Sequence, residues 1–467
     1  MKKSLGVKRH LPVALVSIFL FLFSLLIIGQ NLDKPFWGEH DWNGVRYGNI
    51  ARNYFKYGLI NLKFAQVENS GPINGHQIEY FTHYPPLFPI LISLSYKIFG
   101  ISEWSTRLVP LLASSGSILL IFLIGTKLWD FKTGFLAALL SLVIPINLYF
   151  GKTPVHEPVL VFFILLSFLA YLYLKSSDKI QFKVWFILAL IAAHLTTWAG
   201  FFLTPAITIL TIFKRDNYLK GSIFFWLIPI IIFPAYMGFI YLHTGSLIGG
   251  DLLGVFLQRS SLMREIQPTD LNLVNYLARI RLWLFTLYSA TLTLLVAVWF
   301  IFFLKRKLGG SDLQLLILGL FGVTYLIVFP NAAFIHNYLV FYLMPFFVLT
   351  GARVIWLLAG LKIIKKFSLL VPLVFLFIIL LERKPYLDAL NVSDADKLAV
   401  KVGKVINSQT LPSDTVLVSP VRFSYSAENF LKFYSDRRLI FADIEQLDYD
   451  YTVKVNSEQV TFQISKK

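Results

Sequence analysis

The run TRLVPLLASSGSILLIFLIGT at 106–126 and the run PVLVFFILLSFLAYLYL at 158–174 decide the fold class. Each has about the length that an α-helix needs to cross a bilayer, roughly 17–25 residues. Arg107 is the single charge in the first run, and the second run has none. Similar runs recur along the chain. The predicted spans are 11–29, 106–126, 133–150, 158–174, 184–198, 199–213, 222–242, 282–304, 312–329, 338–359 and 367–381. The sequence therefore predicts a polytopic α-helical membrane protein with about eleven transmembrane helices.

The composition of the 467-residue chain agrees with this reading. Apolar residues make up 56% of it and charged residues only 15%, whereas a soluble domain has roughly 25% charged residues. These values exclude a soluble enzyme and a disordered protein. The chain has no cysteine, which excludes disulfides, thiolate metal sites, cysteine nucleophiles and iron–sulfur clusters.

The distribution of lysine and arginine predicts the orientation in the membrane. If the short apolar stretch 86–99 does not cross, eighteen lysines and arginines fall in the N-terminus and the short loops of one side, and Lys152 is alone in the short loops of the other. Positive residues gather on the cytoplasmic side. We therefore expect a multi-pass protein of the plasma membrane with a cytoplasmic N-terminus and an extracytoplasmic C-terminal segment. Stretch 86–99 is then an interfacial or re-entrant helix.

Three long segments are predicted to lie outside the cytoplasm, namely 30–105, 243–280 and 382–467. The last has the composition of a soluble domain, so we divide the chain into a transmembrane module at 1–381 and a small C-terminal domain at 382–467. The predicted elements of this α/β domain are a helix at 394–407, strands at 415–419 and 438–442, and a terminal hairpin formed by YTVKV and QVTFQIS.

The first outer segment, 30–105, carries two acids directly after the first span. Glu39 and Asp41 precede the segment 44–57, in which Tyr47 and other apolar residues recur at helical spacing. We predict an amphipathic helix on the membrane surface that holds the acids near the lipid headgroups. Carboxylates at that depth suit general-base chemistry on a lipid-linked substrate. The alternative is that they only cap the helix.

Further polar residues lie at the outer ends of the predicted spans. Arg107 opens the second span and suits a phosphate clamp, although it also suits an anchor that snorkels to the interface. Glu157 opens the fourth span beside His156 and near Lys152. Carboxylates at a membrane boundary are costly and often functional, but an acid at a helix N-terminus needs no such role.

The order of these elements resembles a known superfamily. An acid follows the first span, then an amphipathic helix, the element THYPPL at 82–87, the run GISEWSTRL at 100–108, and a second acid after the third span. This pattern is similar to the GT-C superfamily of membrane glycosyltransferases, and within it to the protein O-mannosyltransferases and aminoarabinose transferases (glycosyltransferase family 39/83 type). The resemblance covers about 10–360.

The resemblance implies roles for particular residues. Asp41 matches the first catalytic carboxylate and Glu157 the second acid, while His83 and Arg107 match basic residues that contact the donor phosphate. Many members have an adjacent Asp-Glu pair where this chain has Glu39-His40-Asp41, which leaves open which of the two acids is the base; the spacing to the next helix favours Asp41. His336 and Asn337, which open a span, occupy a place where the family often binds the donor; the alternative is interfacial anchoring.

The implied reaction is an inverting single displacement. A polyprenyl-phosphate sugar is the donor, and a lipid, glycan or protein hydroxyl outside the cytoplasm is the acceptor. Arg107, His83 or Lys152 would hold the phosphate that leaves. No cofactor is required by the resemblance, but some members use a divalent cation, for which Glu39, Asp41, Glu157 and His156 are the candidate ligands. No nucleic-acid partner is expected.

The alternative function is a lipid or sugar transporter. Transporters tend to have paired repeats, broken helices and charges near the bilayer midplane. Here the ionisable residues gather at the outer ends of the spans, and the first outer segment is unusually long. Both features favour an enzyme.

The predicted topology is testable because the chain lacks cysteine. Single cysteines placed at positions 60 and 400 should react with an impermeant thiol reagent in intact cells, because both positions are predicted to face outward. A cysteine at 306 should not react. Labelling at 306 without labelling at 400 would invert the orientation.

Overall fold

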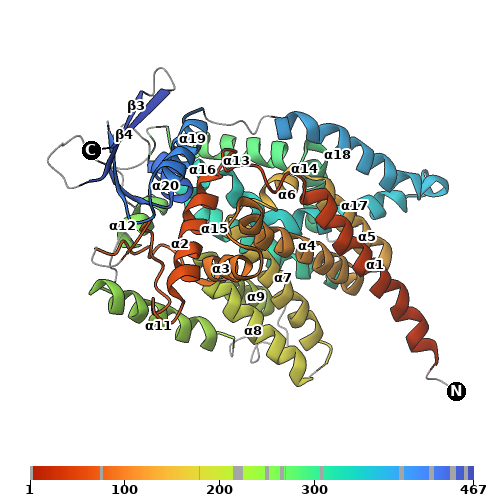
Figure 1. The fold of residues 1–467 in the computed structure, drawn as a ribbon. Coiled ribbons are helices and arrows are strands. Elements are labelled where there is room, and N and C mark those ends of the chain that lie inside the picture. Colours follow the sequence, from red (N-terminus) through yellow and green to blue (C-terminus); the bar gives the residue numbers. More distant parts are fainter. Residues whose placement is uncertain are drawn as a thin grey trace.

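The computed structural model consists of a bundle of helices and a small α/β unit at one end of it (Figure 1). The N-terminus of α1 projects from the far end of the bundle. The structure describes residues 4–73, 77–177, 179–213, 225–247, 252–262, 268, 270–305, 309–388, 394–419, 425–441, 449–456 and 461–466.

The helices of the bundle follow the predicted spans. They are α1 (Ser4–Ile28), α2 (Trp42–Tyr57), α3 (Leu87–Phe99), α4 (Glu103–Leu128), α5 (Phe131–Val143), α6 (Pro145–Phe150), α7 (His156–Leu174), α8 (Ile180–Thr196), η1 (Trp198–Phe202), α9 (Leu203–Phe213), α11 (Leu227–Thr244), α12 (Leu252–Arg259), α13 (Leu273–Leu287), α14 (Ala290–Leu304), α15 (Gly310–Val328), α16 (Pro330–Ile335), η3 (Asn337–Leu343), α17 (Met344–Ala359), η4 (Lys365–Phe367) and α18 (Leu370–Asp388).

Each predicted span overlaps one of these helices or a consecutive pair. By length and composition, five helices in the described part could cross a membrane alone, or six if α13 and α14 count as one broken span. Stretch 86–99 forms α3, whose 13 residues are fewer than a crossing needs. The mostly helical membrane architecture predicted from the sequence is confirmed.

The predicted span 282–304 is wrong as a single straight helix. The chain forms α13 and α14 instead, with a bend of 114° between them. Ser289 at the break has a φ of +74°, in a region that L-residues seldom adopt. Its side chain accepts a hydrogen bond from Leu292 N and so caps α14. Apolarity runs on through the break, so hydropathy alone does not reveal it.

Small residues allow the helices of the bundle to approach closely. Gly125 of α4 faces Gly134 of α5, and a Cβ added to Gly125 would lie 2.6 Å from the Cα of Gly134. In a lipid environment, where no hydrophobic effect draws helices together, such close packing is a main source of association. Arg107 lies toward the other end of α4, near its N-terminus.

Helix α2 does not lie on the membrane surface as predicted, because every residue from Asn43 to Tyr54 is buried. Its apolar side, which includes Tyr47 and Ile50, packs in one cluster with Phe88 of α3. Its polar side donates hydrogen bonds into the outer segment, from Asn53 Nδ2 to the carbonyl of Val67 at 2.8 Å. The sequence correctly predicts two faces on this helix, but protein rather than lipid covers them.

The C-terminal elements confirm the predicted helix, strands and hairpin. They are α19 (Asp394–Gln409), β1 (Thr415–Ser419), α20 (Tyr425–Ser435), β2 (Arg438–Phe441), β3 (Tyr451–Asn456) and β4 (Thr461–Lys466). The strand order is β2-β1-β3-β4, with β1 parallel to both neighbours and β3 antiparallel to β4. Helix α20 was not predicted. The proposed domain boundary after residue 381 falls within α18.

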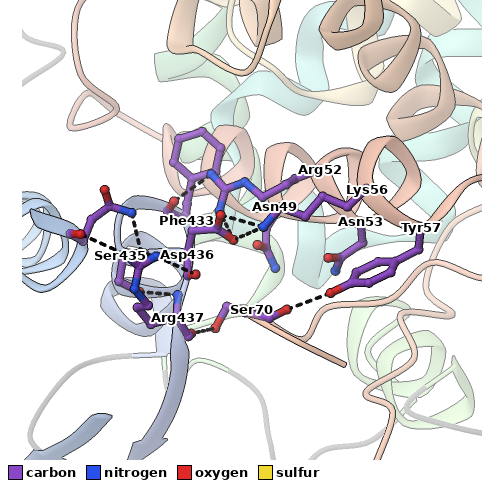
Figure 2. Close-up of polar contacts among 12 residues, drawn as sticks. Asn49, Arg52, Asn53, Lys56, Tyr57, Ser70, Phe433, Ser435, Asp436 and Arg437 are labelled. Carbon is purple, nitrogen blue, oxygen red and sulfur yellow. Dashed lines mark hydrogen bonds and ion pairs between the residues drawn. The ribbon is translucent and has the colours of Figure 1, made fainter. Parts of the chain in front are cut away.

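The C-terminal unit binds the polar side of α2 through hydrogen bonds and ion pairs (Figure 2). Arg52 donates from Nη2 to the carbonyl of Phe433 at 2.7 Å, and its guanidinium lies 4.6 Å from the centre of the Phe433 ring. Arg52 and Lys56 both pair with Asp436, at 3.3 and 2.6 Å. Ser70 donates to the carbonyl of Arg437 at 2.7 Å. The terminal unit, the outer segment and α2 are therefore joined at one interface.

Arg52 should contribute more than Lys56 to the free energy with which the C-terminal unit docks on α2. Arg52→Met removes a buried hydrogen bond, an ion pair and a ring contact, and we expect it to weaken docking by about 2–4 kcal/mol. Lys56→Met removes a partly exposed ion pair, worth at most about 1 kcal/mol. The measurement is the rate at which a protease releases the C-terminal unit under native conditions. Equal acceleration in both variants would contradict this assignment.

Candidate functional site

Asp41 lies immediately before α2, at the position where a capping side chain would sit. Its carboxylate makes no capping bond to the helix. Instead, Oδ2 accepts hydrogen bonds from Trp37 N at 3.2 Å, Gly38 N at 2.9 Å and Arg107 Nη2 at 3.1 Å. The capping alternative for Asp41 is therefore wrong. The carboxylate is held by the chain that precedes it and by α4.

Arg107 connects the segment that follows α1 to the N-terminal end of α4. Besides its bond to Asp41, its Nη1 donates to the carbonyls of Leu32, at 2.9 Å, and Lys34. Its guanidinium also lies 4.3 Å from the centre of the Phe36 ring. The side chain is buried, so it does not snorkel to the surface. Protein groups occupy most of its donors, which favours a positioning role over a phosphate clamp.

A cavity of about 560 Å³ opens beside Asp41, and we call it the cationic cavity. Its charged lining residues are Lys34, Asp41, Arg107, Lys152 and Arg383. Burial, with Arg107 and Lys34 close by, lowers the pKa of Lys152 to about 8. Tyr149 also lines the cavity and donates to the carbonyl of Glu39 at 3.0 Å. The sequence predicted Asp41, Arg107 and Lys152 as site residues, and the structure brings these three together.

Glu39 is not among the residues that line the cationic cavity. Its carboxylate lies 3.4 Å from His40 Nε2, and burial raises its pKa. Burial also lowers the pKa of His40 to about 4, so this imidazole is neutral at physiological pH. His40 packs edge-on against Tyr338, with ring centres 4.7 Å apart. Of the two neighbouring acids, Asp41 is therefore the one that lines the cationic cavity.

A second site, which we call the acidic compartment, contains Glu157. Its lining residues are Trp42, Asn43, Arg46, Tyr47, Phe81, His83, Tyr84, Val155, His156, Glu157, Arg259 and Tyr338. Glu157 Oε1 accepts a hydrogen bond from Tyr342 at 3.0 Å. Within the described part of the chain, Glu157 Oε2 and His156 Nε2 are buried without a hydrogen-bond partner. Buried polar atoms are rarely left so, and a polar ligand would satisfy both.

An apolar cavity of about 390 Å³ adjoins this compartment. Its walls come from η1, α11, α12 and α15, and they include Trp198, Phe233 and Phe256. His83, Tyr84 and Arg259 line both the apolar cavity and the acidic compartment. Arg259 donates to the hydroxyl of Tyr84 and lies 5.0 Å from the centre of that ring. A cation therefore stands where the two spaces meet.

Arg259 was not predicted from the sequence as a site residue. It belongs to LLGVFLQR, a short amphipathic stretch in the outer segment 243–280, where a single arginine looks like an ordinary surface charge. The signal that could have found it is the apolar content of this stretch. An apolar helix in an outer segment must be covered by something, and here it forms one wall of the apolar cavity.

The predicted site residues are distributed over two spaces. Asp41, Arg107 and Lys152 line the cationic cavity, whereas His83, His156 and Glu157 line the acidic compartment. The N-terminus of α2 separates them, since consecutive residues Asp41 and Trp42 line one space each.

His336 and Asn337 lie next to the residues on either side of Asp41, at the start of α2. The His336 ring lies 5.5 Å from that of His40 and 6.4 Å from that of Trp42. The Asn337 side chain also influences His40, because it raises the pKa of that imidazole against the larger, opposite effect of burial. His336 and Asn337 are therefore close to the residues that flank Asp41 in the sequence, and neither is among the residues that line the cationic cavity.

The four candidate ligands for a divalent cation, Glu39, Asp41, His156 and Glu157, do not fit one metal site. Asp41 faces a different space from His156 and Glu157. Among the described residues, no group of three or more histidines and acids is arranged to hold an ion. The mechanism below is therefore built from the side chains alone.

Part of the chain matches a known protein family. Residues 18–236 match the family model of dolichyl-phosphate-mannose-protein mannosyltransferases. No curated protein with which the chain was compared matches it. The structure is similar to that of ArnT from Cupriavidus metallidurans in the apo state, with a TM-score of 0.63 and 13% identity, over 94% of this chain and 86% of that chain.

Two further similar structures hold polyprenyl phosphates. ArnT bound to undecaprenyl phosphate gives a TM-score of 0.61 at 14% identity, over 94% of this chain and 86% of that chain. The oligosaccharyltransferase AglB from Archaeoglobus fulgidus, in complex with an inhibitory peptide and a dolichol-phosphate, gives 0.61 at 12% identity, over 94% and 69%. Because these sequence identities are only 12–14%, the similar structures establish the fold and nothing more specific. The family model covers the part of the chain that contains Asp41, Arg107 and Glu157. The resemblance predicted from the sequence is thus confirmed for part of the chain: residues 18–236, just under half of it, match the mannosyltransferase family model, and the fold is similar to those of ArnT and AglB.

Proposed function

We propose that the protein transfers a sugar from a polyprenyl-phosphate donor to a hydroxyl group of an extracytoplasmic acceptor. The observation that carries this proposal is the pair of spaces joined at Arg259. An apolar cavity adjoins a polar compartment, and His83, Tyr84 and Arg259 line both. A polyprenyl-phosphate sugar has the same three parts in the same order, namely an apolar chain, an anionic phosphate and a polar sugar.

Each part of the donor is assigned to the space whose lining residues have the matching polarity or charge. The isoprenoid chain lies along Trp198, Phe233 and Phe256, where apolar contact favours it. The phosphate lies against the guanidinium of Arg259, whose planar fork matches phosphate oxygens. The sugar is proposed to bind at the acidic compartment, which in this structure has a volume of only about 10 Å³ and must widen to admit it. Its hydroxyls would then donate to Glu157 Oε2 and pair with His156 Nε2, two buried atoms without a partner among the described residues.

The bound lipids of similar proteins support this class of donor. The ArnT structure holds undecaprenyl phosphate, and the AglB structure holds a dolichol-phosphate and a peptide. Both lipids are polyprenyl phosphates, so the same kind of carrier is proposed for this chain. The plasma-membrane location, the cytoplasmic N-terminus and the extracytoplasmic C-terminal domain also belong to this proposal, supported by the loop charges.

The reaction is a single displacement. The acceptor hydroxyl approaches from the cationic cavity, and Asp41 accepts its proton as the oxygen attacks the anomeric carbon. A new carbon–oxygen bond forms with inversion while the bond between the anomeric carbon and the phosphate oxygen breaks. The electron pair leaves with the polyprenyl phosphate, whose charge Arg259 and His83 stabilise. Atoms and charge balance without a cofactor. Glu157 holds the sugar, and Arg107 holds Asp41 in place.

Asp41→Asn should lower turnover by about 10²–10⁴-fold, because asparagine keeps the shape and hydrogen bonds of aspartate but accepts no proton. The measurement is release of polyprenyl phosphate from a labelled donor by the purified protein in detergent. Glu39→Gln is the matched control, since Glu39 is two residues away and does not line the cationic cavity. Near-normal activity in Asp41→Asn with loss in Glu39→Gln would show that Glu39 is the base.

Arg259→Gln should weaken binding of polyprenyl phosphate by at least about tenfold, because it removes a charge-assisted contact worth about 1.5–3 kcal/mol. Direct binding of a fluorescent polyprenyl phosphate measures this. Arg279→Gln is the control, because Arg279 is partly exposed, pairs with Asp270 and does not line the apolar cavity. Equal affinities for Arg259→Gln and the unmodified protein would remove the donor from this site.

A further inference from the structure

The cationic cavity carries more positive charge than its single acid can balance. Four cations and one carboxylate line it, and Arg107 and Asp41 neutralise each other at 3.1 Å. That leaves Lys34, Lys152 and Arg383. Among the described residues, none of these three lies within ion-pair distance of a carboxylate. Glu382, the acid next to Arg383, is used elsewhere, because it accepts from Thr291 N and Oγ1.

The environment of Lys152 shows the effect of this crowding. Its ammonium contacts the carbonyl of Gln30, a neutral group. Burial and two neighbouring cations, Arg107 and Lys34, lower its pKa to about 8. Like charges held together in a partly buried space are unfavourable unless an anion joins them. A ligand with two negative charges would offset that cost.

We infer that the cationic cavity binds a phosphate group on the acceptor, so that the acceptor substrate is an anionic, phosphate-bearing molecule. This inference rests on the proposed function, since it takes Asp41 as the base that faces the acceptor. Lys34, Lys152 and Arg383 are the residues that contact the phosphate. Three ammonium or guanidinium groups around one phosphate form the charge-assisted hydrogen bonds that such groups prefer.

The donor phosphate does not fit this cavity as well. A donor needs an apolar channel beside its phosphate, and such a channel adjoins Arg259, on the other side of the start of α2. The cationic cavity is lined mainly by polar residues, and it contains Asp41. An acceptor must reach the base, so the anion that this cavity selects belongs to the acceptor.

The test uses the full chain in detergent and inorganic phosphate as the probe. The readout is the rate at which a small amine-reactive reagent acylates Lys152 at pH 8, measured by mass spectrometry. Phosphate should slow this reaction, because a bound anion keeps the ammonium protonated. The half-protecting phosphate concentration should rise as the pH increases above about 8, where Lys152 loses its proton. The double variant Lys34→Gln/Arg383→Gln should need at least about tenfold more phosphate.

Two controls separate this site from the donor site. Arg259→Gln should leave protection by phosphate unchanged, while Lys34→Gln/Arg383→Gln should leave binding of polyprenyl phosphate unchanged. Absence of protection in the unmodified protein would overturn the inference, as would its loss in Arg259→Gln. Protection by vesicles of phosphatidylglycerol but not by soluble phosphate would also overturn it, because the cations would then serve a lipid headgroup. None of these readouts requires turnover, so failure of the proposed transferase activity would be seen separately.

Discussion

The ion pair between Arg107 and Asp41 is the contact on which the rest of the site depends. It joins the N-terminal end of α4 to the start of α2 at 3.1 Å, and both side chains are buried. A buried pair contributes little net stability, yet loss of one partner leaves an uncompensated charge. Such a pair therefore acts mainly to define one arrangement of the loop. Here the arrangement presents a carboxylate to a cavity.

Distant parts of the chain support this arrangement. The Phe36 ring lies beneath Arg107, and the Phe36 backbone N–H donates to the hydroxyl of Tyr434 at 2.8 Å. That hydroxyl donates in turn to Glu103 Oε1 at 3.0 Å, at the start of α4. The C-terminal unit thus reaches the loop that carries Asp41 by two routes, through Tyr434 and through the grip on α2 shown in Figure 2. Removing that unit would take away both of these supports.

The sequence predicts whatever depends on local pattern. Apolar runs locate the helices, and alternation locates the strands of the C-terminal unit. Features that depend on distant partners were missed or misread. The polar side of α2 looks like a water-facing surface until Phe433 and Asp436 are seen to cover it. The bend at Ser289 interrupts a run that stays apolar throughout.

The candidate site likewise has features that the sequence predicts and features that depend on distant parts of the chain. Asp41, Arg107, His83 and Glu157 were found because residue type and order resemble a family, but their distribution over two spaces depends on where α2 begins. Arg259 lies 218 positions after Asp41, and no local pattern distinguishes it from a surface arginine. Its importance comes from what it adjoins, an apolar cavity on one side and Glu157 on the other.

The most direct test of this account is an experimental structure of the protein with a bound polyprenyl phosphate. The account predicts a phosphate within hydrogen-bonding distance of the Arg259 guanidinium, with the isoprenoid chain running past Trp198 and Phe256. A phosphate bound instead between Lys34 and Lys152, with the chain leaving along α1, would contradict the assignment of donor and acceptor to their separate spaces.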